Sequence, residues 1–402
     1  MASPLLDLRP GEGRTLLLLG GHLFLVLAGN TLLATAAEAL FLARYPYSWM
    51  PYTYLAGAFW TVVASFLYGK VKERLSPAGV TRVITAVSVA VLVLTLLVLL
   101  VWPAFGPFVL QMLTPAFGVL GGMESAALVA RAVSTRQARR LYPAISGIGG
   151  VGATIGAYSV AVLSRSMSPL VLVGSTSVFL AAAMLLAVRV RGIEARRDRA
   201  KPAPWRDVLA NRFSLLLISL VCVSGVLTTC VKFQLSACVK ETFTEAQIKV
   251  YLGQLYGALN AASIVFGVLV TRLLIRWLGV SASLLVYPLL LLGCGIAGVA
   301  SPGLVVTSTA LFAERLFRQN LQRPLLNIAI MPLPEQLAAR ATIAIRGAVE
   351  TPAIALTSIV LLLGASWIPW AAVSYVVAAA ALLGVLCVLW ARPCYRRELV
   401  EA

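Results

Sequence analysis

Charged and polar residues interrupt an apolar stretch in the last third of the chain, LFAERLFRQNLQRPLLN. Glu314, Arg315, Arg318 and Gln322 recur there at helical spacing, which predicts one polar stripe along a helix. Two interpretations stay open. Glu314 and Arg318 are four residues apart, so they can pair with each other. Alternatively, the stripe can bind a charged solute. Arg315 lies outside that pair, and we expect it to face a solute or another helix.

Two further apolar stretches carry polar residues that could contact the same solute. Thr35 and Glu38 share a face of residues 15–42, and Lys232 lies well inside residues 213–238. Ionisable groups at membrane depth are costly and mark functional positions. We therefore predict that the substrate is anionic and that it contacts Thr35, Glu38, Lys232, Arg315, Arg318 and Gln322.

Other charges within apolar stretches are expected to pair or to support gating. Arg346 and Glu350 are again four residues apart, which favours a structural pair over a ligand site. Arg140 and Arg340 lie at the start of apolar stretches and are predicted to be gating or structural charges. Glu124 is expected to neutralise a basic residue on another helix.

The segment YPAISGIGGVGATIG contains Gly147, Gly149 and Gly152 in the G-x-G-x-x-G pattern of dinucleotide-binding turns. That chemistry needs a buried strand before the glycines and a helix after them. The segment instead lies within an apolar stretch of helical length. Gly152 and Gly156 also form a small-xxx-small pair, which favours close packing of membrane helices over nucleotide binding.

Residues for metal or catalytic chemistry are scarce. The six cysteines form no C-x-x-C pair, and His22 is the only histidine. No P-loop, nucleophile elbow or pair of catalytic carboxylates is visible. We expect no cofactor, no metal and no enzymatic activity.

The composition is that of a membrane protein. Hydrophobic residues make up 60% of the 402 residues, only 12% are charged, and the mean hydropathy is +0.92. Soluble domains have about a quarter charged residues. Continuous apolar runs argue against a β-barrel and predict twelve spanning helices, close to the ~20 residues that each needs. They are residues 15–42, 50–69, 82–103, 104–130, 141–164, 168–190, 213–238, 248–275, 281–300, 303–328, 337–363 and 367–391.

Lysine and arginine collect in alternate connections between these spans, most of all in residues 191–212. The positive-inside rule then places both termini in the cytoplasm. We expect a multi-pass protein of a bacterial inner membrane. The net charge of +18 is expected to favour anionic lipid headgroups. No compact basic domain is present, so nucleic-acid binding is not expected.

A shift of 200 residues aligns several landmarks of the two halves, such as Gly57 with Gly257 and Gly147 with Gly347. This predicts two six-helix bundles, residues 1–190 and 213–402, joined by a basic cytoplasmic linker at 191–212. An all-α protein of twelve transmembrane helices in two pseudo-repeats is the architecture of the major facilitator superfamily.

Three segments resemble the ATP/ADP translocase family of nucleotide transporters: QARRLYPAISGIG, the stretch from KETFTEAQIKVYLG to TRLLIRWLGV, and RPLLNIAIMPLPEQLAARATIAI. The resemblance implies a divergent bacterial branch of that family. Leu326 and Asn327 replace the family's Lys-Glu pair, Thr342 and Arg346 replace two further charged positions, and Arg340 keeps one basic position. The resemblance therefore implies the fold and not ATP/ADP exchange.

The leading hypothesis is an alternating-access transporter of an anionic organic solute, such as a nucleotide or another phosphorylated compound. The alternative is a membrane sensor or anchor for a partner protein that does not transport. The expected partners are the solute and membrane lipids, and we expect a monomer.

Overall fold

The computed structural model describes residues 12–75, 77–133, 135–190, 204–330, 333–343, 348–364 and 367–401. Over these ranges the chain forms helices joined by short turns, and no strand occurs within them. Thirteen of the predicted linker residues, 191–203, lie outside the described residues. The helical character follows from long apolar runs, because a backbone in lipid must satisfy its own hydrogen bonds.

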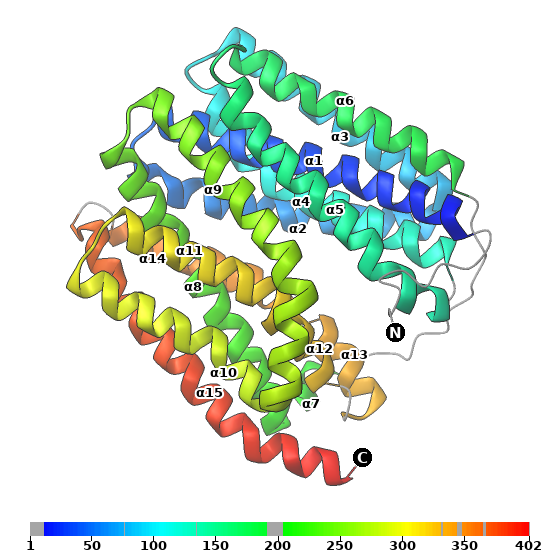
Figure 1. Cartoon of the computed structure of the whole chain (residues 1–402), viewed down its shortest axis with the longest axis vertical. Helices are drawn as coiled ribbons and strands as arrows, with labels where there is room; N and C mark the ends of the chain where they lie inside the picture. The colour runs from blue at the N-terminus through cyan, green and yellow to red at the C-terminus, as the bar shows by residue number, and fades with distance from the viewer. Residues whose placement is uncertain are drawn as a thin grey trace, which may run out of the picture. The chain divides into compact units, whose positions relative to one another are not determined.

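The α-helices, in chain order, have the following bounds (Figure 1). They are α1 Glu12–Arg44, α2 Met50–Arg74, α3 Pro77–Val101, α4 Gly106–Ala132, α5 Thr135–Leu163, α6 Pro169–Arg189, α7 Trp205–Ala210, α8 Arg212–Thr242, α9 Glu245–Val265, α10 Thr271–Ala300, α11 Leu304–Phe317, α12 Arg323–Ala329, α13 Glu335–Ile343, α14 Glu350–Gly364 and α15 Val373–Glu401.

Short helices of other types connect some of these elements. Two 3-10 turns, η1 Tyr47–Trp49 and η5 Trp370–Ala372, precede α2 and α15. Two π turns, η2 Phe266–Val270 and η3 Arg318–Gln322, interrupt otherwise continuous helix. The second π turn contains two of the predicted substrate contacts.

Eight helices of the described chain are long and apolar enough to cross a membrane. The four other predicted spans fall on α2 and on helices that are interrupted: α9 with η2, α11 with η3 and α12, and α13 with α14. Large apolar side chains also stay exposed, for example Leu17 at 73% and Val305 at 78%. Such exposure suits a surface that contacts lipid.

Local sequence explains where several helices begin and end. Pro103 lies in the turn between α3 and α4, and Pro107 lies in the first turn of α4, where proline is well tolerated because its missing N–H would have no partner within the helix. Ser168 caps α6 by accepting a hydrogen bond from the Val171 N–H at 3.4 Å. Gly279 has a φ of 72° and kinks α10, a conformation that glycine adopts without steric cost.

Packing groups the chain into two compact units. Unit 1 comprises residues 1–45, 59–196 and 243–264, and unit 2 comprises 46–58, 197–242 and 265–402. Each unit therefore contains most of one sequence half and one segment from the other half. The division into two six-helix bundles at residues 191–212 rests on the sequence repeat and stays a prediction.

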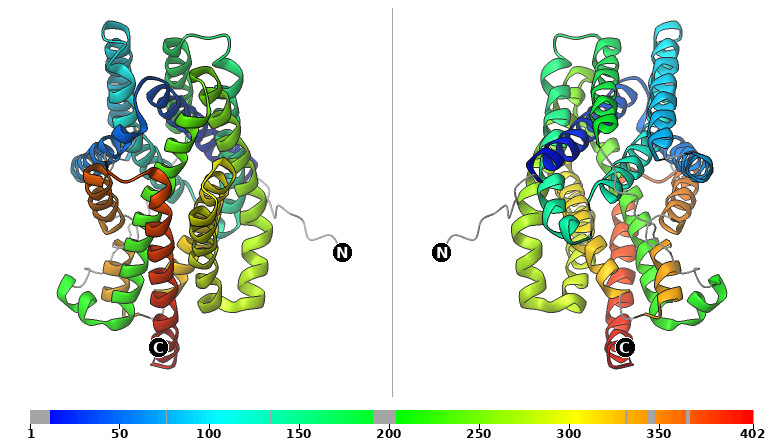
Figure 2. Two further views of the ribbon diagram at one scale, coloured as in Figure 1. Left: turned by 90° about the vertical axis from the view of Figure 1, so that its left-hand side faces the viewer. Right: turned by 90° about the vertical axis from the view of Figure 1, so that its right-hand side faces the viewer.

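Helix α1 is the centre of unit 1, where it packs against α4, α5 and α6 (Figure 1). Its buried face is rich in alanine and leucine, such as Leu33, Ala36 and Ala37, which lets neighbouring helices approach closely. In unit 2, α8 has the corresponding role. It packs against α11, α14 and α15, and α15 also lies along α10 (Figure 2).

Candidate functional site

Arg318 is the centre of a buried charge cluster in unit 2. Its Nε lies 2.5 Å from Glu314 Oε1 and its Nη1 lies 2.6 Å from Glu350 Oε1. Glu314 is fully buried, and Arg318 is 8% exposed. The predicted pairing of Glu314 with Arg318 is therefore confirmed, and the same guanidinium also binds a carboxylate from α14.

Glu350 holds a second arginine as well. Arg323 Nη2 lies 2.9 Å from Glu350 Oε2 and donates a further hydrogen bond to Oε1 at 3.2 Å. Arg323 is half exposed, so its other donors reach the surroundings of the cluster. The expected partner Arg346 lies outside the described residues, and the partners that the structure gives Glu350 come from η3 and α12.

Polar side chains of α8 complete the cluster. Thr228 donates to Glu314 Oε1 at 2.6 Å, and Gln322 Nε2 donates to Ser224 Oγ at 2.9 Å. Thr228 and Ser224 are one helical turn apart, which places both hydroxyls on the same face of α8. The first contact joins α8 to α11 through a hydrogen bond to a charged group, and the second joins α8 to η3 through the Gln322 amide.

Two more cations lie around Glu314. Lys232 and Arg315 act electrostatically on its carboxylate, and both side chains are half-buried. With Arg318 and Arg323, four cations lie around the two carboxylates Glu314 and Glu350 in the described part of the chain. Among these six groups the cations outnumber the carboxylates, an arrangement that attracts anions.

The backbone that carries these groups is irregular. Arg318 and Gln322 lie at the two ends of the π turn η3, between α11 and α12. π turns are rare in proteins, but a large share of those that occur lie at functional sites.

The predicted contacts on the first helix belong to unit 1. Thr35 is buried at 1% exposure, and Glu38 accepts a hydrogen bond from the Tyr256 hydroxyl of α9 at 2.8 Å. Asn260, one turn further along α9, donates to the Ala153 carbonyl of α5 at 3.2 Å. These bonds attach α9 to α1 and α5.

The remaining basic residues have separate surroundings. Arg340 on α13 stacks over the Trp205 ring of α7, with 5.1 Å between the guanidinium carbon and the ring centroid. This contact is a cation–π interaction near the cytoplasmic linker predicted from sequence. Arg140 lies in α5, but its side chain is outside the described part of the structure.

The glycine-rich segment lies within α5, as the packing interpretation predicted, and no strand precedes it in the described chain. A Cβ at Gly152 or Gly156 would collide with the backbone of Phe24 or Ala28 on α1. A Cβ at Gly149 would meet the side chain of Leu23, which also lies on α1. The glycines therefore serve close helix packing, and the dinucleotide fingerprint is coincidental.

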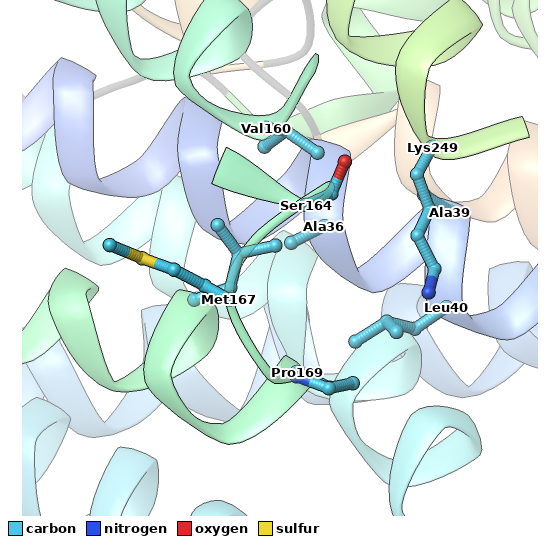
Figure 3. Close-up of a pocket in the computed structure, with 9 residues that line it drawn as sticks. Ala36, Ala39, Leu40, Val160, Ser164, Met167, Pro169 and Lys249 are labelled. Atoms are coloured by element: carbon cyan, nitrogen blue, oxygen red, sulfur yellow. The ribbon is translucent and has the colours of Figure 1, made fainter. Parts of the chain in front are cut away.

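A small hollow in unit 1 lies between α1, α5 and α6, beside Lys249 of α9 (Figure 3). Its wall is mostly aliphatic, and Lys249 and Ser164 supply polar groups. Its volume is about 230 Å³, which includes space open to solvent. Pockets for organic ligands usually enclose about 300–1,000 Å³. We therefore do not place the solute there.

Searches of family models and of curated proteins give no match. Solved structures do match along almost the whole chain. A mutant of the nucleoside transporter NupG has a TM-score of 0.67 at 14% identity, over 94% of this chain and 99% of that one. A D-xylose–proton symporter has 0.66 at 12% identity, over 94% and 96%. A bacterial homologue of the iron transporter ferroportin, in an inward-facing state, has 0.65 at 16% identity, over 94% and 98%.

The chain has the major facilitator fold. Together with the apolar helices, this fold makes it an integral, multi-pass, all-α membrane protein. Identities of 12 to 16% show the fold alone. The narrower resemblance to ATP/ADP translocases stays a prediction.

Sequence reasoning missed two polar residues beside the Arg318 cluster and, in unit 1, the partner of Glu38. Ser224 and Tyr287 are buried beside the cluster, and Tyr256 binds Glu38. Each lies in an apolar helix as a single polar group, so nothing in its sequence neighbourhood distinguishes it from a packing residue. Glu124, expected to neutralise a basic residue, instead accepts a hydrogen bond from Thr85 at 3.3 Å and forms no ion pair with the described residues.

Proposed function

We propose that this protein is an alternating-access membrane transporter of an anionic organic solute, with a nucleotide or another phosphorylated compound as the preferred class. The major facilitator fold supports transport. The gathering of four cations around Glu314 and Glu350 supports an anion, and this is the observation on which the substrate class depends.

The energetic cost of the cluster supports a role in binding. An arginine or lysine at the centre of a membrane helix costs about 2.5–3.5 kcal/mol on insertion scales. Glu314 and Glu350 offset the charges of Arg318 and Arg323, and Lys232 and Arg315 bring two further cations close to Glu314. An anionic solute would bind such cations through charge-assisted hydrogen bonds.

Roles within the cluster differ under this proposal. Arg318 is held by two carboxylates, so it fixes the geometry of the site. Lys232 and Arg315 are the residues proposed to contact the solute, with Gln322 as a neutral donor beside them. Thr35 and Glu38 remain proposed contacts from α1.

The test is uptake by proteoliposomes. The purified protein would be offered labelled nucleotides and other phosphorylated or carboxylated solutes, with the matching neutral nucleosides for comparison. We expect uptake of an anionic member and none of its neutral counterpart. Arg315→Ala and Lys232→Ala should each weaken its affinity by about tenfold or more, since a hydrogen bond to a charged group contributes about 1.5–3 kcal/mol. The exposed Arg206 of α7 supplies the control, Arg206→Ala.

A structural role for Arg315 makes a different prediction. Arg315→Ala would then lower thermal stability, and Glu314→Gln in the same chain would restore it. Unchanged affinity for a proven substrate in both cation variants would contradict the proposed site. Uptake of no solute, together with firm binding of a partner protein, would favour the sensor alternative over transport.

A further inference from the structure

Unit 1 contains a second buried polar cluster, which the solute site does not use. Glu124 of α4 is 8% exposed and lines a hollow of about 360 Å³, a volume that includes space open to solvent. His22, Asn30, Thr85 and Ser88 line the same hollow. The enclosed part has room for about one water molecule, and polar walls are what such a water needs.

The Glu124 carboxylate is held by neutral groups. Its Oε1 accepts from the Thr85 hydroxyl of α3 at 3.3 Å. The titratable groups that face it are His22 from α1 and Tyr68 from α2. Helix α6 contributes only apolar groups to the wall of the hollow, Leu180, Ala183 and Met184.

No ion pair to Glu124 occurs within the described chain. A buried carboxylate without a cation is costly when ionised, and such groups commonly bind a proton instead. The site therefore differs from the Arg318 cluster, in which every carboxylate has a cationic partner. A gain or loss of one proton would therefore change the charge of this hollow, and no described residue forms an ion pair that would compensate it.

His22 is placed to exchange a proton within the same hollow. The side chain is 2% exposed, and its Nδ1 lies 3.0 Å from the Ala183 carbonyl. A carbonyl only accepts, so Nδ1 carries a hydrogen. Nε2 lies 3.4 Å from the Ser125 hydroxyl and is then the nitrogen that can be free or protonated.

We propose that Glu124 and His22 form a proton-binding site, and that the occupancy of this site is coupled to movement of the solute. Helix α1 carries His22 and also Glu38, whose carboxylate is bonded to α9. Protonation at the hollow therefore changes the charge on the same helix that contributes predicted solute contacts. The hydroxyl and amide groups around Glu124 are also oxygen donors that suit a sodium ion, so sodium is the competing occupant that the experiment must separate from a proton.

Infrared difference spectroscopy of the purified protein tests the proton site without any transport. Lowering the pH should produce the carbonyl band of a protonated carboxylic acid, and Glu124→Gln should remove that band. Glu245→Gln, at an exposed glutamate of α9, should leave it unchanged. His22→Asn provides a second variant and should shift the pH at which the band appears. A band that survives Glu124→Gln, or that neither variant moves, would overturn the proposal.

Proteoliposomes test the coupling. With a transported solute in hand, an imposed pH gradient should drive its accumulation in the original protein. Glu124→Gln should lose that accumulation while solute exchange across the membrane continues. Accumulation driven by a sodium gradient at constant pH, or accumulation that Glu124→Gln leaves intact, would overturn the coupling. Absence of uptake for every solute would contradict the proposed function, whereas the spectroscopic result would still decide the proton site.

Discussion

At the scale of single residues, the Arg318 cluster combines charge neutralisation with a local excess of cations. Arg318 shares its guanidinium between carboxylates from α11 and α14, so one side chain joins three segments of unit 2. Breaking a buried pair is costly because it leaves a charge uncompensated. The stability of unit 2 and the geometry of the site therefore depend on the same residue.

Arg318→Gln should lower the free energy of unfolding by about 3–5 kcal/mol, because Glu314 and Glu350 then lose their shared cation. The effect would be measured as a lower thermal unfolding midpoint in detergent micelles. Adding Glu314→Gln to the same chain should recover part of the loss. Equal stability of Arg318→Gln and the original protein would show that the cluster is not buried as described.

Tyr256→Phe tests the bond that attaches α9 to α1. The change removes one hydroxyl and keeps the ring, so we expect a loss of about 1.5–3 kcal/mol, the contribution of a hydrogen bond to a charged group. Tyr142→Phe, at a tyrosine that is 55% exposed on α5, is the matched control. Thermal unfolding of the two variants side by side makes the comparison, and equal midpoints would contradict the Tyr256–Glu38 bond.

At the scale of elements, the contact between α1 and α5 depends on glycine. The positions of Gly152 and Gly156 bring the two backbones together, and any side chain there would force the helices apart. Gly147 lies on the same helix, and a Cβ there would meet nothing within 4 Å. The three glycines thus lie on one helix and differ in their surroundings.

Gly152→Leu and Gly156→Leu should greatly reduce the yield of folded, monodisperse protein, because the leucine would meet the backbone of α1. Gly147→Leu should be tolerated. Size-exclusion chromatography in detergent gives the readout for all three. None of the proteins should bind a nicotinamide or flavin dinucleotide, and co-purification of one in stoichiometric amount would contradict the packing interpretation.

At the scale of the whole molecule, the orientation in the membrane is predicted from the distribution of lysine and arginine. The 191–212 segment should face the cytoplasm, and the connection between α5 and α6 should face the opposite side. The structure describes helices and their packing within each unit, so orientation requires a separate measurement.

Single cysteines in a cysteine-free background test the orientation. Ala195→Cys in the linker should react with a membrane-impermeant maleimide only after the cells are opened. Met167→Cys, at a residue that is 40% exposed between α5 and α6, should react in intact cells. The reverse pattern would invert the topology and would place the basic linker outside.

The sequence by itself determined the features that depend on local chain geometry. Apolar runs of spanning length predict the helices, Pro103 and Pro107 predict the break between α3 and α4, and four-residue spacing predicts the pairing of Glu314 with Arg318. These follow because lipid forces the backbone into helix and because a helix fixes which neighbours share a face. The high share of hydrophobic residues is likewise enough to predict a helical membrane protein, because a backbone in lipid must form its own hydrogen bonds.

Only the tertiary structure decided which distant groups meet. Glu350 pairs with Arg318 and Arg323, Tyr256 donates a hydrogen bond to Glu38, and Thr85 donates one to Glu124. Each of these contacts depends on how the packed helices are rotated and how far apart they lie. Apolar helices of similar composition can pack in many such arrangements, so the sequence does not specify one of them.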